Sequence, residues 1–220
     1  MAFRKILGYK AYSRMGAGTP SVPPYTPVKW VKGTGSAIDT GIKQTINTEV
    51  YFELFIPSRN SGTYQSFEFG ARVSATSAGR IALYYDTAAG TTFIPREWTY
   101  RFGNKQTDTQ TTPNGGAVNT YRFNKDGSWF NGNLVQALTG TTFIQENLNL
   151  YLMGVNNNGA LGSPSDTFYG WVSAYIKDGD VLLRDFKAAK DNDGKYCFYD
   201  LVSKQFFYPI SGNLTGEDLP

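Results

Sequence analysis

The chain contains no histidine and a single cysteine among its 220 residues. Without histidine, neither a Ser-His-Asp nor a Cys-His catalytic arrangement can form, and histidine-ligated metal sites are excluded as well. With one cysteine, Cys197, no disulfide can form within the chain, so the fold does not depend on an oxidising compartment. Cys197 lies in an apolar run, and we interpret it as a small buried hydrophobic side chain.

Long apolar runs are also missing. No segment approaches the roughly 20 apolar residues that a membrane-spanning helix needs. After Arg4 and Lys5 only Ile6 and Leu7 are strongly apolar before Gly8, whereas the core of a signal peptide takes roughly 7–15 apolar residues. We therefore expect neither an export signal nor a membrane span. An apolar stripe with a 3.6-residue period is absent too, which disfavours a helical fold.

Acidic residues are absent from the first 38 positions, which carry six basic residues. Residues 39–220 carry the other 15 basic residues and all 18 acidic ones, so the two parts differ in the sign of their charge. Residues 1–28 are rich in glycine and proline, which favours an extended arm over a packed element. The predicted organisation is an anchoring arm, residues 1–28, followed by a globular body, residues 29–220.

Basic side chains alternate with apolar and aromatic ones in the first half of the arm. A purely solvated tail would not need so many apolar groups, so we expect these residues to dock on a partner protein. The predicted docking residues are Phe3, Arg4, Lys5, Ile6, Leu7, Tyr9, Lys10, Tyr12 and Arg14. A flexible tail is the alternative, and nucleic-acid binding is disfavoured because the charges are sparse.

Aromatic residues (15%) and 24 glycines favour many short strands joined by turns. Residues 48–56 (TEVYFELFI) alternate, with Val50, Phe52, Leu54 and Ile56 on one face. Asn-Gly and Asp-Gly pairs, which suit tight hairpins, separate most of the other strand-like segments. These segments are residues 66–75, 80–85, 98–102, 117–124, 128–130, 133–138, 148–154, 167–177, 181–187, 195–200 and 205–208. The pattern predicts an all-β fold, an antiparallel β-sandwich of two sheets of the jelly-roll type.

Five segments, taken in order, resemble those of the concanavalin A-like and laminin-G-like family of lectin β-sandwiches. They are residues 34–41 (TGSAIDTG), 67–72 (FEFGAR), 121–135 (YRFNKDGSWFNGNLV), 150–159 (LYLMGVNNNG) and 168–209, which holds two aromatic-rich runs around a KDGD turn. The resemblance implies a lectin- or glucanase-like sandwich, and its setting implies a structural protein of a tailed bacteriophage or a surface protein of a gut bacterium. The arm has no counterpart in this family.

The spacing of the carboxylate residues along the chain disfavours a glycoside-hydrolysing enzyme. Glucanases of this class present a pattern such as E-x-D-x-x-E on one strand, and the chain lacks it. The nearest pair is Glu49 and Glu53, whose Cα atoms on one strand would lie about 13 Å apart. Glycosidases separate their two carboxyl groups by about 5–9.5 Å. We therefore expect no enzyme, and we expect no cofactor.

A metal site is also not indicated. Residues 191–194 (DNDG) resemble the start of a calcium loop, but Val202 occupies the twelfth position, where such a loop has a bidentate glutamate. We interpret these residues, and Asp178 and Asp180, as turn residues. A calcium site built from distant loops is the alternative.

Two functions fit these observations. The first is a non-enzymatic structural component of a phage virion, such as an auxiliary capsid or head-fibre protein, docked through the arm on other virion proteins in an oligomeric assembly. The alternative is a carbohydrate-binding module on a phage appendage or a bacterial surface protein. Aromatic platforms would then stack against sugars, with core packing as the competing role for each ring. By residue type alone the candidates are Trp98, Tyr100, Trp129 and Tyr169.

Overall fold

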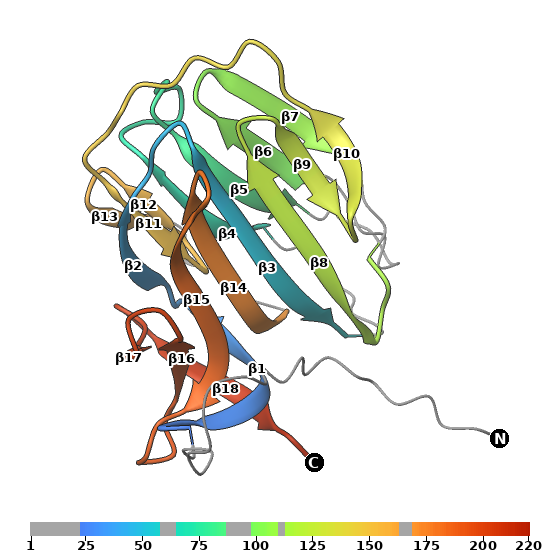
Figure 1. The fold of residues 1–220 in the computed structure, drawn as a ribbon, viewed down its shortest axis with the longest axis vertical. Coiled ribbons are helices and arrows are strands. Elements are labelled where there is room, and N and C mark those ends of the chain that lie inside the picture. The colour runs from blue at the N-terminus through green and yellow to red at the C-terminus, as the bar shows by residue number, and fades with distance from the viewer. Residues whose placement is uncertain (1–22, 58–64, 87–97, 110–112, 163–168) are drawn as a thin grey trace, which may run out of the picture.

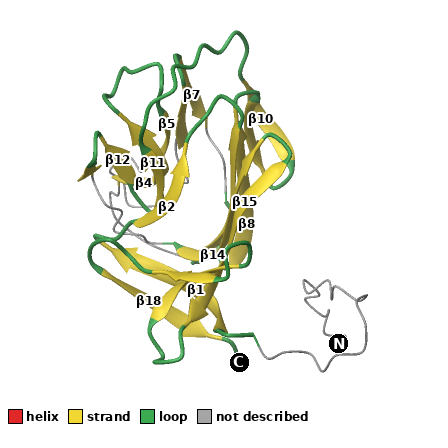
Figure 2. Cartoon of the chain, turned by 60° about the vertical axis from the view of Figure 1, so that its left-hand side comes forward, coloured by secondary structure: helices red, strands yellow, loops and turns green. Residues whose placement is uncertain are grey.

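A computed structural model describes residues 23–57, 65–86, 98–109, 113–162 and 169–220. These residues form two β-sheets that face each other across a core (Figure 2). No helix occurs within the described ranges, and so none that could cross a membrane. The predicted all-β sandwich is confirmed.

The larger sheet has ten strands, and its neighbouring strands are antiparallel (Figure 1). β14 pairs with β3 on one side and with both β15 and β1 on the other, and β18 pairs with β1. In spatial order the strands are β10 (Asn133–Ala137), β9 (Gly127–Phe130), β8 (Ala117–Asn124), β3 (Thr48–Ile56), β14 (Gly170–Asp178), β1 (Thr26–Thr34), β15 (Val181–Lys190), β16 (Tyr196–Asp200) and β17 (Gln205–Phe207), with β18 (Asn213–Asp218) beside β1.

The second sheet has eight strands. Its order is β13 (Ala160–Gly162), β12 (Val155–Asn157), β4 (Gln65–Arg72), β5 (Ile81–Asp86), β6 (Trp98–Phe102) and β7 (Lys105–Thr109), and β11 (Asn149–Leu152) joins β4 to β2 (Ile38–Lys43). β12 and β4 run parallel, whereas the other pairs in this sheet are antiparallel.

The core lies between the two sheets and follows from the alternation along β3. Its inward side chains, Val50, Phe52, Leu54 and Ile56, are 0–1% exposed. Burial of each contributes about 1.5–3 kcal/mol before chain entropy is subtracted. Phe52 packs against Trp171 of β14 at 4.9 Å between ring centroids, so the two central strands share one aromatic cluster.

Most predicted strands lie where the sequence places them, but six strands were missed: β1, β2, β7, β12, β13 and β18. The segment 148–154 was predicted as one strand, and the structure ends β11 at Leu152 because Met153 takes a positive φ of 61°. Three predicted turns have glycines with clearly left-handed φ values, at Gly132, Gly179 and Gly194. At the predicted Asn114-Gly115 turn the positive φ falls one residue later, at Gly116.

The body begins at Thr26 rather than at residue 29, because β1 extends through the Pro27-containing end of the predicted arm. Tyr25 also packs on the body, with its ring stacked 4.4 Å from that of Tyr199. The nine predicted docking residues of the arm, Phe3 to Arg14, lie outside the described residues. Cys197 is fully buried and unpaired, as predicted.

Candidate functional site

The outer face of the ten-stranded sheet, the side turned away from the eight-stranded sheet, carries the candidate site. On β3 the side chains that point away from the core are Glu49, Tyr51, Glu53 and Phe55, all half-buried. None of the described elements lies in front of β3, β8 and β14 when the sheet is viewed from this side (Figure 1). The described part of the chain therefore leaves the outer face uncovered at the centre of the sheet.

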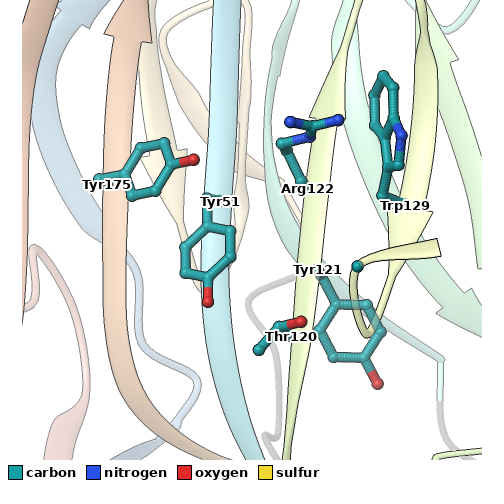
Figure 3. A pocket seen from close by; sticks show the side chains of 7 residues that line it. Tyr51, Thr120, Tyr121, Arg122, Trp129 and Tyr175 are labelled. Atoms are coloured by element: carbon teal, nitrogen blue, oxygen red, sulfur yellow. The ribbon is translucent and has the colours of Figure 1, made fainter. Parts of the chain in front are cut away.

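A hollow of about 200 Å³ lies on this face (Figure 3). Its centre is a single row of side chains, because the strand register places Tyr175 opposite Tyr51, Tyr51 opposite Arg122, and Arg122 opposite Trp129. Residues opposite one another on antiparallel strands have neighbouring side chains. The hollow is lined by Tyr51, Thr120, Tyr121, Arg122, Trp129, Gly132 and Tyr175.

The row consists of two stacked pairs. The rings of Tyr51 and Tyr175 are nearly parallel, at 7°, with centroids 4.7 Å apart. The guanidinium carbon of Arg122 lies 3.8 Å from the centroid of the Trp129 ring, a cation–π contact. Both contacts restrict the rotamers of the side chains, so the aromatic surface exists before any ligand binds.

Two glutamates fix the tyrosine pair. The Tyr51 hydroxyl donates to Glu53 Oε1 (3.0 Å), and the Tyr175 hydroxyl donates to Glu49 Oε1 (3.2 Å). Burial, reinforced by the adjacent carboxylate, raises the pKa of both phenols, that of Tyr175 to about 12. Both hydroxyls therefore stay protonated at physiological pH and keep their carboxylate partners.

The second oxygen of each carboxylate is also occupied. Glu49 Oε2 accepts a hydrogen bond from Asn124 Nδ2 (2.9 Å), and Glu53 Oε2 accepts one from Ser173 Oγ (2.8 Å). All four carboxylate oxygens of Glu49 and Glu53 thus accept hydrogen bonds from within the protein. We therefore interpret both glutamates as residues that position the tyrosine rings.

Two cations in or beside this row of side chains have no carboxylate partner among the described residues. Arg122 contacts Trp129, and Lys177 Nζ lies 5.1 Å from the centroid of the Tyr175 ring. The ion pairs of the described residues involve other side chains, such as Lys29 with Glu217. The hydrogen-bond donors of Arg122 and Lys177 thus remain available to a ligand.

Of the four predicted stacking residues, one lies in the hollow. Trp129 is half-buried beside Arg122. Tyr100 and Tyr169 are 1% and 3% exposed and pack in the core, so neither can present a ring face to a sugar. Trp98 lies on β6, and its side chain is outside the described part of the chain. Tyr51, Tyr175 and Arg122 were not predicted as site residues.

The predicted turn at residues 191–194 is confirmed. Asp191 Oδ1 accepts hydrogen bonds from the backbone amides of Asp193 and Lys195, both at 2.9 Å, and Oδ2 accepts one from the Tyr208 hydroxyl at 2.6 Å. These bonds, that of Tyr208 first, lower the pKa of Asp191. Across the described ranges, no group of three or more histidine, cysteine or acidic side chains is placed to hold a metal ion.

Comparison with known proteins supports the fold. No protein-family model and no curated protein sequence matches the chain. Among solved structures, a candidate carbohydrate-binding protein from Bacteroides ovatus matches with a TM-score of 0.55 at 10% identity, over 90% of this chain. The chain spans 62% of that protein's length. The carbohydrate-binding module CBM40 of a Ruminococcus gnavus sialidase matches with a TM-score of 0.42 at 16% identity, over 69% of this chain and 88% of that one.

Proposed function

We propose that the protein is a non-catalytic carbohydrate-binding module and that the outer-face hollow is its binding site. The observation that carries this proposal is the fixed row of Tyr175, Tyr51, Arg122 and Trp129 on an open sheet face. The fold similarity to the Bacteroides ovatus protein supports the same class of function.

The chemistry of the row suits a sugar. A pyranose ring has an apolar face of C–H groups and a rim of hydroxyls. The face of the Trp129 ring that Arg122 does not cover offers a flat apolar surface for the C–H face, while Arg122 and Thr120 offer hydrogen-bonding groups for the rim. A hollow of about 200 Å³ is smaller than most small-molecule sites, as suits a ligand that leaves part of each ring in solvent.

Glycan-array binding by the purified protein tests the proposal. The array should hold host and bacterial glycans together with linear plant, algal and animal polysaccharides, both neutral and acidic. We expect binding to at least one of these glycans, and a loss of about tenfold or more in the Trp129→Ala variant, because the variant removes the apolar surface.

The Tyr208→Ala variant is the matched control, because Tyr208 is also an exposed aromatic residue but lies at the far end of the sheet beside Asp191. It should bind as the unchanged protein does. An array without any signal, or equal losses in the two variants, would contradict the proposed site.

The predicted virion role is a separate proposal about where this module acts. A virion domain can also bind host or mucosal glycans, so the two functions are compatible. The residues that would dock it on other virion proteins lie in the arm, outside the described residues. Mass spectrometry of purified phage particles tests this role, and absence of the protein from the particles would refute it.

A further inference from the structure

A second pair of aromatic side chains lies on the outer face, away from the hollow. Trp30 of β1 and Phe55 of β3 are stacked, with ring planes 3° apart and centroids 6.4 Å apart. Both are half-buried. Val118, opposite Phe55 on β8, is 47% exposed and extends the apolar surface. We call Trp30, Phe55 and Val118 the second platform, and the row of Tyr175, Tyr51, Arg122 and Trp129 in the hollow the first platform.

Close packing and a hydrogen bond hold Trp30 of the second platform in place. Trp30 lies directly over Gly170 of β14, where a Cβ atom would come within 2.4 Å of the indole ring. The indole Nε1 donates to Glu217 Oε2 of β18 at 3.0 Å, and Lys29 holds the other oxygen of Glu217 at 2.7 Å. A glycine under the ring and an anchored indole N–H fix Trp30 flat against the sheet.

The two platforms are joined along one strand. Tyr51 and Phe55 are four residues apart on the same face of β3, which separates them by about 13 Å. Between them Glu53 and Ser173 form a polar floor. One sugar ring is no larger than an aromatic side chain, so a single ring cannot cover both platforms. A chain with one ring on each platform and at least one ring between them fits the spacing.

Cations accompany the aromatic rings at both ends. Lys32 Nζ lies 5.7 Å from the Trp30 ring centroid, as Arg122 and Lys177 lie beside the rings of the first platform. Lys32 is exposed and, among the described residues, forms no ion pair. Both platforms therefore combine an apolar ring with a donor for the hydroxyls of a sugar.

We propose that the Trp30–Phe55 pair is a second sugar-binding platform and that the outer face binds a linear oligosaccharide that spans both platforms. This inference rests on the proposed carbohydrate binding and adds the ligand class: an internal stretch of a linear polysaccharide, recognised over several units, in place of a single terminal sugar.

Calorimetric titration with a size series tests the inference. The probe is a set of fragments of one to eight units, prepared by partial hydrolysis of whichever linear polysaccharide binds most strongly in the array. In the unchanged protein, affinity should rise with fragment length until a fragment spans both platforms. Trp30→Ala should weaken the long fragments by about tenfold and leave mono- and disaccharide binding unchanged, whereas Trp129→Ala should weaken all lengths.

The outcomes separate the two proposals. If no glycan binds, the proposed function and this inference fall together. If fragments bind but affinity does not depend on length, or if Trp30→Ala weakens all lengths equally or none, only the inference falls.

A measurement on the unchanged protein covers the case in which Trp30→Ala does not fold. In NMR spectra of protein with 15N-labelled tryptophan, the Trp129 indole signal should shift with every fragment. The Trp30 indole signal should shift only with long fragments. A Trp30 signal that is unaffected by the longest fragment would overturn the inference.

Discussion

Replacing Gly170 with alanine tests whether Trp30 lies where the structure places it. A Cβ atom at position 170 would be 2.4, 2.6 and 2.7 Å from Cγ, Cδ2 and Cβ of Trp30. Carbon atoms in contact are normally about 3.5–4.0 Å apart, so the indole has to move by about 1 Å. Forcing such an overpacked contact destabilises a protein by about 1–3 kcal/mol.

A double-mutant cycle isolates this contact. Position 170 has no positive φ, and alanine is favoured over glycine in a strand by about 0.5–1 kcal/mol when nothing is in the way. In a Trp30→Gly background, which removes the Cβ atom as well as the indole ring, the Gly170→Ala change should therefore be neutral or slightly stabilising. We expect a coupling free energy of about 1–3 kcal/mol between the two positions.

The assay is urea unfolding of the four proteins, followed by far-UV circular dichroism so that the loss of an indole does not alter the signal. For the two proteins that retain Trp30, the unchanged protein and Gly170→Ala, tryptophan fluorescence checks that unfolding followed by fluorescence coincides with unfolding followed by circular dichroism. For a chain of this size, 1 kcal/mol corresponds to about 2–4 °C in Tm, which provides a second readout. An equal effect of Gly170→Ala in both backgrounds would refute the placement of Trp30, and with it the second platform.

Three further predictions concern other parts of the molecule. The pKa of Tyr175 is raised to about 12, so the stability that its protonated hydroxyl contributes is complete below pH 10 and is lost as the pH rises toward 12. In urea unfolding at several pH values, the free energy of unfolding of Tyr175→Phe should therefore fall less steeply above pH 10 than that of the unchanged protein, and parallel curves for the two proteins would contradict this. Cys197 is fully buried, and burial raises its thiol pKa to about 12, so a thiol reagent should label it only in denaturant; rapid labelling of the native protein would contradict the predicted packing. Asp200 is fully buried and accepts hydrogen bonds from the backbone amides of Asp185, Val202 and Ser203, so Asp200→Ala should lower the free energy of unfolding by about 3 kcal/mol in urea titrations, and a loss under about 1 kcal/mol would count against this network.

The sheet assignment follows from local signals in the sequence. Alternation along residues 48–56 gives both the core face and the outer face of β3, and the Asp-Gly and Asn-Gly pairs mark turns that the structure contains. β1 and β18 lack such signals. They pair with each other although nearly the whole chain separates them, and no local pattern encodes a pairing over that distance.

The candidate site shows a second feature that could not be predicted from the sequence alone. Tyr100 was a candidate by residue type, yet it shares a face with Phe102 by the two-residue period, and that face is the core. The row that forms the hollow comes from β14, β3, β8 and β9, and it exists only through their register. The sequence shows that Tyr51 faces away from the core, but it does not show which side chains lie beside it.

The composition of the outer face argues for binding in preference to packing. The four inward side chains of β3 make its contacts with the core, so folding requires of its outer face only that the side chains there tolerate water. Polar residues would satisfy that need, yet Tyr51 and Phe55 occupy that face. Tyr51 is stacked on Tyr175 of the adjacent strand β14, and Phe55 is stacked on Trp30 of β1, one strand further along the sheet. Aromatic surface kept partly open in this way costs solubility without adding to the core. Because Trp129 also lies on this outer face, Trp129→Ala should weaken binding about tenfold or more and leave the unfolding transition almost unchanged. A merely structural aromatic residue would not show this separation.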